Sequence, residues 1–236
     1  MKRWLSVPVL GLLLVLAACG DETSVTKRFR VIATAEVDGQ KVEGSTVMEI
    51  TYEKLDEKRS AVGRGGTATA TGEALILDLK GRGTVYVLPV ENYLPSGALL
   101  EVYKQGLLRS LGITHGIGTL TGEDLDRVRQ ARGRIPFQGL GNRLPAFVAF
   151  RDEKDPKTIY EVDPKNVGQS FPGVGFVGLE IEFADAPVTN VLKQRLPWLE
   201  NPKNEQRFEQ DPPGQQRAVV DRPIGFKMTT ELFFEH

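Results

Sequence analysis

The chain has 236 residues, of which 30 are Lys or Arg and 31 are Asp or Glu, and its net charge is −1. This balance excludes the strong positive field of a nucleic-acid-binding domain, so we expect no nucleic-acid partner. The length is sufficient for one or two small domains with a sizeable core, and the single cysteine excludes an internal disulfide framework.

Residues 1–18 have the layout of a secretory signal peptide. Lys2 and Arg3 provide a positive start, residues 4–18 are uncharged and mostly apolar, and the run ends in small residues. A membrane-spanning helix is the alternative, but such a helix needs about 20 apolar residues to cross the hydrocarbon core. The run here is shorter and is interrupted by Pro8, so we expect a leader that is removed.

The single cysteine follows this apolar run directly. The motif Leu16-Ala17-Ala18-Cys19 resembles the lipobox of bacterial lipoproteins, in which Leu and two small residues precede Cys. The resemblance implies that the thiol of Cys19 receives a diacylglycerol, that the leader is cut before Cys19, and that the new amino group is acylated. Two or three acyl chains on one residue hold a protein at a membrane, whereas a single chain binds only marginally.

The same resemblance implies a location in a bacterial cell envelope, with the membrane contacted through the lipid on Cys19. In enterobacterial lipoproteins, Asp directly after the cysteine is the signal for retention in the inner membrane. Here Gly20 follows the cysteine, and Asp21 comes one place later. We therefore expect attachment to the outer membrane, facing the periplasm, rather than to the inner membrane.

Residues 19–26 form a short polar segment, which is typical of a tether. A hairpin is predicted directly after this segment. Apolar and polar residues alternate over 27–37, the pair Asp38-Gly39 favours a two-residue turn, and 41–54 supplies the partner strand.

A second hairpin is predicted after a charged and glycine-rich loop over 55–66. Its strands are expected over 67–79 and 84–90, on either side of a short glycine-containing turn. We expect both hairpins to form one antiparallel sheet over 27–90.

Two amphipathic helices are predicted in the middle of the chain. Apolar residues recur at helical spacing over 97–113, in a helix that Gly106 breaks or weakens. Over 121–134, Thr121 can cap the N-terminus, and acidic residues precede arginines, as the helix dipole favours. Both helices are short for isolated stability, so we expect them to pack on the sheet.

Strands return over 146–183. Two short strands flank a turn over 153–157, a single helical turn is predicted over 163–171, and a longer strand is predicted over 175–183. The alternation in this last strand predicts one inward and one outward set. The inward set is Val177, Leu179, Ile181 and Phe183, and the outward set is Glu180 and Glu182.

A last helix is predicted from Thr189 to the residue before Pro197, and Trp198 is expected to be an anchor in the core or in a groove. Residues 200–236 are polar and contain several prolines. They are predicted to be a linker followed by a C-terminal strand or tail.

The predicted fold class is α+β, a mainly antiparallel sheet built from hairpins with two or three short helices packed on it. The predicted organisation is a signal peptide over 1–18, a lipidated tether over 19–26, a globular body over 27–199, and a polar linker with a C-terminal strand or tail over 200–236. An alternative divides the body into subdomains 27–90 and 91–199.

The segment 152–199 contains "DPKTIYEVDP", "FPGVGF" and "APVTNVLKQRLPWL". It is loosely similar to segments of uncharacterised proteobacterial proteins of similar size. This resemblance implies no activity, so no functional residue is taken from it.

Motifs for catalysis or cofactor binding are lacking. His115 lies in a glycine-rich loop between the two predicted helices, but the chain has no G-x-S-x-G nucleophile motif and no spare cysteine to act with it. The chain also lacks a P-loop, an H-E-x-x-H motif and a calcium loop, so neither a cofactor nor a metal site is predicted. A structural or surface role for His115 is favoured over catalysis.

The densest basic stretch contains Arg127, Arg129, Arg132 and Arg134. One interpretation is contact with anionic lipid headgroups or another polyanion. The favoured interpretation is a solvated helix face.

Two classes of function stay open. The favoured one is a membrane-anchored envelope lipoprotein that acts as a non-catalytic binding, scaffold or assembly-accessory module, with an envelope protein as its candidate partner. It is favoured because an anchor is predicted and catalytic motifs are not. The alternative is an envelope hydrolase that uses carboxylates or His115. It requires His115 to lie within hydrogen-bond reach of an Asp, Glu or Ser inside a cleft.

Overall fold

The computed structural model describes residues 23–55, 65–91, 100–200 and 229–235. The predicted signal peptide, Cys19, most of the predicted loop over 55–66 and most of the polar linker after 200 lie outside the described residues. Among the residues described, no helix is long and apolar enough to cross a membrane.

A long antiparallel hairpin forms the centre of the first sheet. Strands β1 (Ser24–Val37) and β2 (Gln40–Lys54) pair along their whole length, and Asp38 and Gly39 both adopt positive φ at the turn between them. The predicted hairpin is thus confirmed. The full strand order is β11-β3-β2-β1-β10-β7. The other strands of this sheet are β3 (Gly66–Glu73), β7 (Arg134–Pro136), β10 (Val174–Phe183) and β11 (Phe234–Glu235).

A second antiparallel sheet has the strand order β4-β5-β8-β9, with β6 paired to the end of β5. Its strands are β4 (Leu75–Asp78), β5 (Thr84–Glu91), β6 (Leu100–Glu101), β8 (Pro145–Phe150) and β9 (Ile159–Glu161). Because β5 pairs with β8, this sheet combines strands from both sides of the alternative boundary between 27–90 and 91–199. The predicted α+β class is confirmed.

The chain crosses from the first sheet to the second at Ala74. The N–H of Ala74 donates to the carbonyl oxygen of Phe233 at 2.8 Å, and beyond this point the strand pairs with β5 instead of β2. Gly44 of β2 allows β4 to approach closely, because a Cβ at Gly44 would stand 2.2 Å from the carbonyl oxygen of Ile76. The prediction of one sheet over 27–90 is therefore wrong, since alternation along a strand does not record which strand it pairs with.

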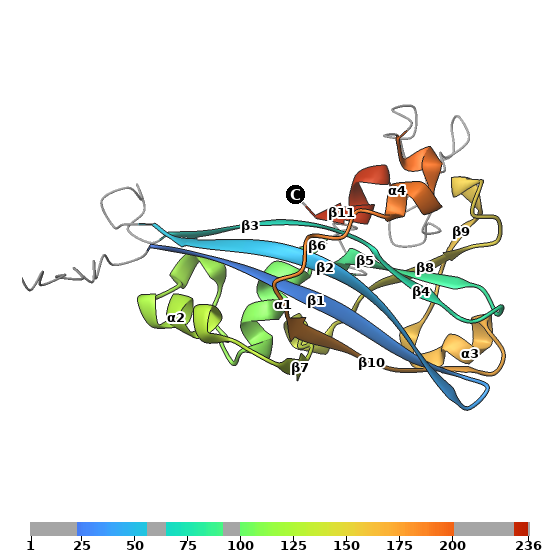
Figure 1. Cartoon of the computed structure of the whole chain (residues 1–236), viewed down its shortest axis with the longest axis horizontal. Coiled ribbons are helices and arrows are strands. Elements are labelled where there is room, and N and C mark those ends of the chain that lie inside the picture. Colours follow the sequence, from blue (N-terminus) through green and yellow to red (C-terminus); the bar gives the residue numbers. More distant parts are fainter. Residues whose placement is uncertain (1–22, 56–64, 92–99, 201–228, 236) are drawn as a thin grey trace, which may run out of the picture.

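The main core lies between the two sheets, and a second core lies on the other face of β5. Val85 and Val87 point into the main core, whereas Tyr86, Leu88 and Val90 belong to the second core. This explains why 84–90 is an almost continuous apolar run. Figure 1 shows the chain after β10, in orange and red, covering the outer face of the second sheet.

Short helices connect the strands and cover the sheets. The α-helices are α1 (Tyr103–Ser110), α2 (Gly122–Gln130), α3 (Val167–Ser170) and α4 (Leu192–Arg195). The 3₁₀ turns are η1 (Ile117–Thr119), η2 (Leu140–Asn142), η3 (Pro156–Thr158), η4 (Pro164–Asn166), η5 (Pro197–Glu200) and η9 (Thr230–Phe233). The helix predicted to begin at Thr189 begins at Leu192 instead, because Thr189 pairs with β2: its N–H donates to Val47 O and its hydroxyl accepts from Val47 N.

Gly106 lies inside α1 and does not break it. A Cβ at this position would stand 2.5 Å from the ring of Phe137, which packs edge-on against Tyr103 at 5.6 Å between ring centres. The glycine therefore makes room for an aromatic ring. The predicted break at Gly106 is wrong, whereas the predicted weakening of the helix stays a prediction.

We expect Gly106→Ala to destabilise the protein, although alanine is the better helix former. Overpacking against the buried ring should cost about 1–3 kcal/mol, which exceeds the gain of about 1 kcal/mol in helix propensity. Urea unfolding measures the difference. Gly122→Ala is the control, because no atom lies within 4 Å of its added Cβ; equal stabilisation by both substitutions would contradict the packing argument.

One side-chain orientation in β10 differs from the prediction. Leu179 and Ile181 are buried as expected, but Val177 is 54% exposed and Phe176 packs on Phe147 instead. The register of β10 against β1 shifts between Thr34 and Ala35, so one extra residue stands in β10 at this point. A bulge of this kind reverses the alternation beyond it.

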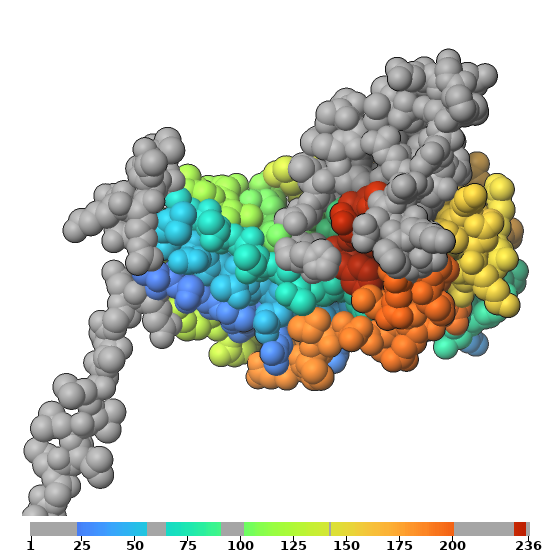
Figure 2. All heavy atoms as spheres, turned by 90° about the horizontal axis from the view of Figure 1, so that it is seen from above, coloured from blue at the N-terminus to red at the C-terminus, as the bar shows by residue number. Residues whose placement is uncertain are grey.

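The folded body extends past both predicted limits. β1 begins at Ser24, which pairs with Glu53, so the last residues of the predicted tether 19–26 are strand. At the other end, η9 and β11 pack on the second core and on β3. Figure 2 shows this C-terminal segment, in red, beside the orange part of the chain that contains α4. Phe233 is fully buried there, so residues beyond 199 belong to the body as well.

Candidate binding pocket

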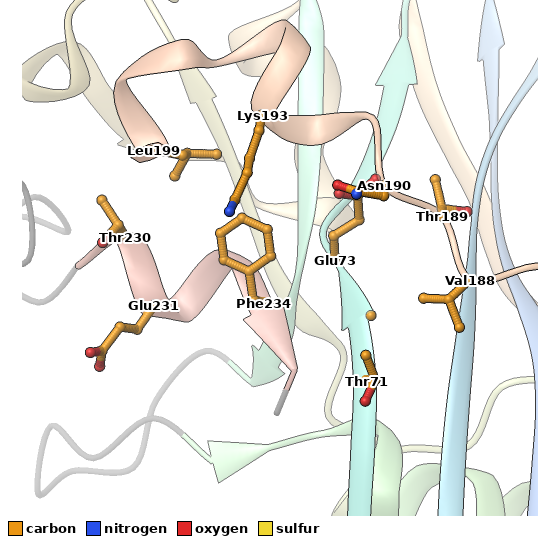
Figure 3. Close-up of a pocket in the computed structure, with 11 residues that line it drawn as sticks. Thr71, Glu73, Val188, Thr189, Asn190, Lys193, Leu199, Thr230, Glu231 and Phe234 are labelled. Carbon is orange, nitrogen blue, oxygen red and sulfur yellow. The ribbon is translucent and has the colours of Figure 1, made fainter. Parts of the chain in front are cut away.

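A pocket of about 530 Å³ lies where the end of β3, the segment 188–193 and the C-terminal segment 230–234 meet. Figure 3 shows the side chains of these three segments around it. Its wall combines hydroxyl groups with apolar surface. The hydroxyls come from Thr71, Thr189 and Thr230, and the apolar groups come from Val188, Leu199 and Phe234.

Glu73 fixes the segment that closes one side of the pocket. Its side chain is buried, and its two carboxylate oxygens accept hydrogen bonds from the backbone N–H groups of Val191 at 2.8 Å and Leu192 at 3.1 Å. Val191 is the N-cap residue of α4 and Leu192 is its first residue, so their N–H groups have no partner within the helix and Glu73 satisfies both. Glu73 is therefore a positioning group, and both of its oxygens are used within the fold.

Lys193 supplies the positive charge of the pocket. Its Nζ lies 5.5 Å from the ring centre of Phe234, and Figure 3 shows the side chain extending toward that ring. A cation over an aromatic face gains about 0.5–1 kcal/mol at an exposed site. The Lys193 side chain is exposed, so its ammonium group can also pair with a ligand. The carboxylate of Glu231 points away from it in Figure 3.

A second hollow of about 510 Å³ lies beside the start of β10. It is bounded by Leu144, by Val174 and Phe176, and by the turn 164–168. Lys165 is its one charged lining residue. This hollow has no buried polar side chain in its lining, whereas the pocket beside Glu73 is built around one.

His115 contacts a carboxylate, as the alternative hypothesis of a hydrolase requires. Its Nε2 lies 2.9 Å from Oδ2 of Asp124. The same oxygen accepts from the hydroxyl of Thr121 at 2.6 Å and from its backbone N–H at 2.8 Å, and Thr121 caps α2 in return. Asp124 is thus one half of a capping box. His115 lines neither of the two pockets, and the arrangement is that of a helix start.

The pKa of Asp124 lies below its ordinary value. Burial raises the pKa of this carboxyl, but hydrogen bonds from Thr121 and from His115 outweigh the burial. A carboxyl whose pKa is depressed in the folded state adds stability above its unfolded pKa of about 3.9. That stability is lost as the pH falls through the lowered, folded pKa.

We expect Asp124→Asn to lower the free energy of unfolding by about 1 kcal/mol at neutral pH, as the loss of a cap does. The difference from the wild type should shrink as the pH falls from about 4 through the lowered, folded pKa, below which the wild-type carboxyl is also neutral. Urea unfolding at a series of pH values measures it. Asp126→Asn in the same helix is the exposed control; a difference that stays constant into acid would contradict this role for Asp124.

The arginines of the predicted basic stretch divide into two groups. Arg134 bonds Glu43 at 2.9 Å and Glu180 at 2.5 Å on the outer face of the first sheet. Arg127, Arg129 and Arg132 remain at the C-terminal half of α2 and just beyond it. Arg134 therefore does not belong to the predicted helix face, because it lies on β7 and forms ion pairs with Glu43 and Glu180.

Trp198 is half-buried in the second core, as an anchor is. Its ring packs edge-on against Phe150 and Phe233, and its Nε1 donates to the carbonyl oxygen of Glu153 at 2.7 Å. The expected role of Trp198 in the core is consistent with these contacts.

Comparison with known proteins gives no relative: no protein-family model, no curated protein and no solved structure matches the chain. Within the described part of the chain, no three His, Cys, Asp or Glu side chains are grouped as metal ligands are. The site is therefore interpreted from its own geometry.

The sequence does not predict the pocket. The wall on β3 precedes the other two walls by more than a hundred residues of chain, and no local pattern joins the three. One signal was present: Glu73 is the one charged residue in the otherwise uncharged run 65–77. A lone acid inside a strand with apolar neighbours indicates a buried carboxylate with a fixed partner.

Proposed function

We propose that the protein is a lipid-anchored envelope protein whose soluble body is a non-catalytic binding module. The acyl chains on Cys19 hold it at the outer membrane, facing the periplasm, and the pocket between β3, 188–193 and 230–234 takes the ligand. The observation that carries the binding role is the pocket itself, because its volume of about 530 Å³ falls within the range of small-molecule sites.

The chemistry of the lining favours a ligand with an apolar body and an anionic or hydrogen-bond-accepting end. Phe234 and Leu199 offer apolar surface, while Lys193 and the hydroxyl of Thr189 offer a cation and a donor. Glu73 keeps its negative charge, but two backbone N–H groups bind its oxygens, so it repels an anion less than a free carboxylate would. An extended side chain or a terminus of an envelope protein also fits this description.

The pocket is tested with a small aromatic anion, anilinonaphthalene sulfonate, as a probe. We expect saturable binding with a rise in fluorescence, and a loss of affinity of at least about tenfold in Thr71→Trp, which places a large side chain in the lining of the pocket. Thr69→Trp is the matched control, since Thr69 is exposed on the same face of β3 but does not line the pocket. Equal binding by both variants would contradict this assignment.

The hydrolase alternative is favoured by one observation, the contact between His115 and Asp124. A nucleophile must also lie against the imidazole. The described hydrogen bonds give His115 no such partner: the hydroxyl of Thr121 is directed to Asp124 instead. We therefore place binding ahead of catalysis.

A further inference from the structure

Four cationic side chains gather at the end of the molecule where β1 begins. They are Lys27 on β1, Arg127 and Arg129 on α2, and Arg132 just after it; they are called the basic end below. Nζ of Lys27 donates to the carbonyl oxygen of Arg129 at 3.1 Å, and Arg129 donates to the carbonyl oxygen of Ser24 at 3.5 Å. Figure 1 shows α2 beside the start of β1.

The positive charge of the basic end is only partly balanced. Asp126 forms an ion pair with Arg129. Lys27 and Arg132 both donate to the carbonyl oxygen of Arg129, at 3.1 Å and 2.7 Å, so these like charges lie close together. Burial lowers the pKa of Lys27, and the charge of Arg132 lowers it further. The negative charge of Asp185 raises the pKa of Lys27, because it favours the charged ammonium group. Arg127 and Arg132 are exposed. Arg127 donates to the carbonyl oxygen of Leu111, and Arg132 donates to those of Arg129 and Ala131.

The length of chain before β1 limits how far this end can lie from a lipid on Cys19. Five peptide units separate Cys19 from Ser24, and an extended chain spans at most about 3.6 Å per residue. The start of β1 thus lies within about 18 Å of the acylated residue, which is about two Debye lengths at physiological salt. Charges at the far end of the long hairpin have no such constraint.

We propose that the basic end docks on anionic phospholipid headgroups and sets the orientation of the body on the bilayer. This inference rests on the proposed anchor at Cys19. The acyl chains on Cys19 supply the affinity for the membrane. The basic end determines which face of the body lies against it. Each cation near an anionic bilayer changes the equilibrium constant between docked and undocked orientations about fivefold. The pocket, near the other end of β3, then stays open to the periplasm.

The test uses the acylated protein in vesicles of phosphatidylcholine, with or without phosphatidylglycerol, that contain a trace of headgroup-labelled acceptor lipid. Because Cys19 is the single cysteine, its acylation leaves an introduced thiol as the only labelling site. A donor dye is placed at Gln130→Cys on α2 or at Gln40→Cys on the far hairpin, both exposed positions. We expect strong energy transfer from Gln130→Cys when phosphatidylglycerol is present, several-fold less without it, and little from Gln40→Cys in either.

Charge reversal supplies the second arm. Arg127→Glu and Arg132→Glu should each reduce the phosphatidylglycerol-dependent transfer at least about fivefold. Arg82→Glu, at an exposed ion pair with Asp38 on the far hairpin, should not reduce it. Equal transfer with and without phosphatidylglycerol, at a normal acyl mass, overturns this proposal alone. An unmodified Cys19 in the mass spectrum overturns the anchor and this proposal together.

Discussion

Cys19→Ser should release the protein from the membrane completely. The motif Leu16-Ala17-Ala18-Cys19 resembles the lipobox, in which the diacylglycerol is attached to the cysteine thiol. A serine hydroxyl at this position is not expected to receive it. Each buried methylene contributes about 0.8 kcal/mol, so removal of two or three acyl chains removes far more binding free energy than a basic surface supplies. Labelling with a radioactive or alkyne-bearing fatty acid, followed by membrane fractionation, measures both losses.

Gly20→Ala is the matched control for this experiment. It changes the neighbouring residue but keeps the thiol, so label and membrane association should stay at wild-type levels. Retention of label by Cys19→Ser would place the acyl chain elsewhere and would refute the assignment. Loss of label with full membrane association would contradict the expected release, since the protein would then bind the membrane without its acyl chains.

Phe233→Ala should destabilise the fold by about 3–5 kcal/mol, the largest expected effect of a single core substitution. The Phe233 side chain is fully buried, stacks on Phe150 with 6.3 Å between ring centres, and packs edge-on against Trp198 at 5.9 Å. Its carbonyl oxygen also accepts from Ala74 at the crossing between the sheets. Removal of the ring leaves a cavity among residues distant in sequence.

Urea unfolding of the mature protein measures this loss of stability. The affinity of the pocket for the fluorescent probe should fall as well, because Thr230 and Phe234, near Phe233 in the chain, line the pocket. Glu231→Ala is the control, since Glu231 is an exposed residue of the same 3₁₀ turn and should change stability by no more than about 0.5 kcal/mol. A loss below about 1 kcal/mol for Phe233→Ala would show that the C-terminal segment is not part of the cooperative core.

The parts of the fold that depend on neighbouring residues could be predicted from the sequence. The Asp38-Gly39 turn sets the β1–β2 hairpin, and Thr121 caps α2 with Asp124 three residues later. Both signals act within four residues of chain, where backbone preference and short-range hydrogen bonds decide the structure. The apolar alternation of 175–183 likewise identified β10, apart from the bulge near Val177.

The features that depend on distant partners could not be predicted. Ala74 marks a change of sheet only because Phe233 bonds to it, and Gly106 is required only because Phe137 packs there. The candidate pocket is of this kind throughout: β3 supplies Glu73, and the segment that Glu73 holds begins at Val191, more than a hundred residues away. Periodicity and turn chemistry contain no information on such pairings.

The intact mass of the protein purified from its native membrane tests the account most directly. We expect a mature chain that begins at Cys19 and carries a diacylglycerol with a further acyl group on its amino terminus. A chain that retains residues 1–18, or one whose Cys19 is a free thiol, would contradict the anchor, and with it the placement of the pocket in the envelope.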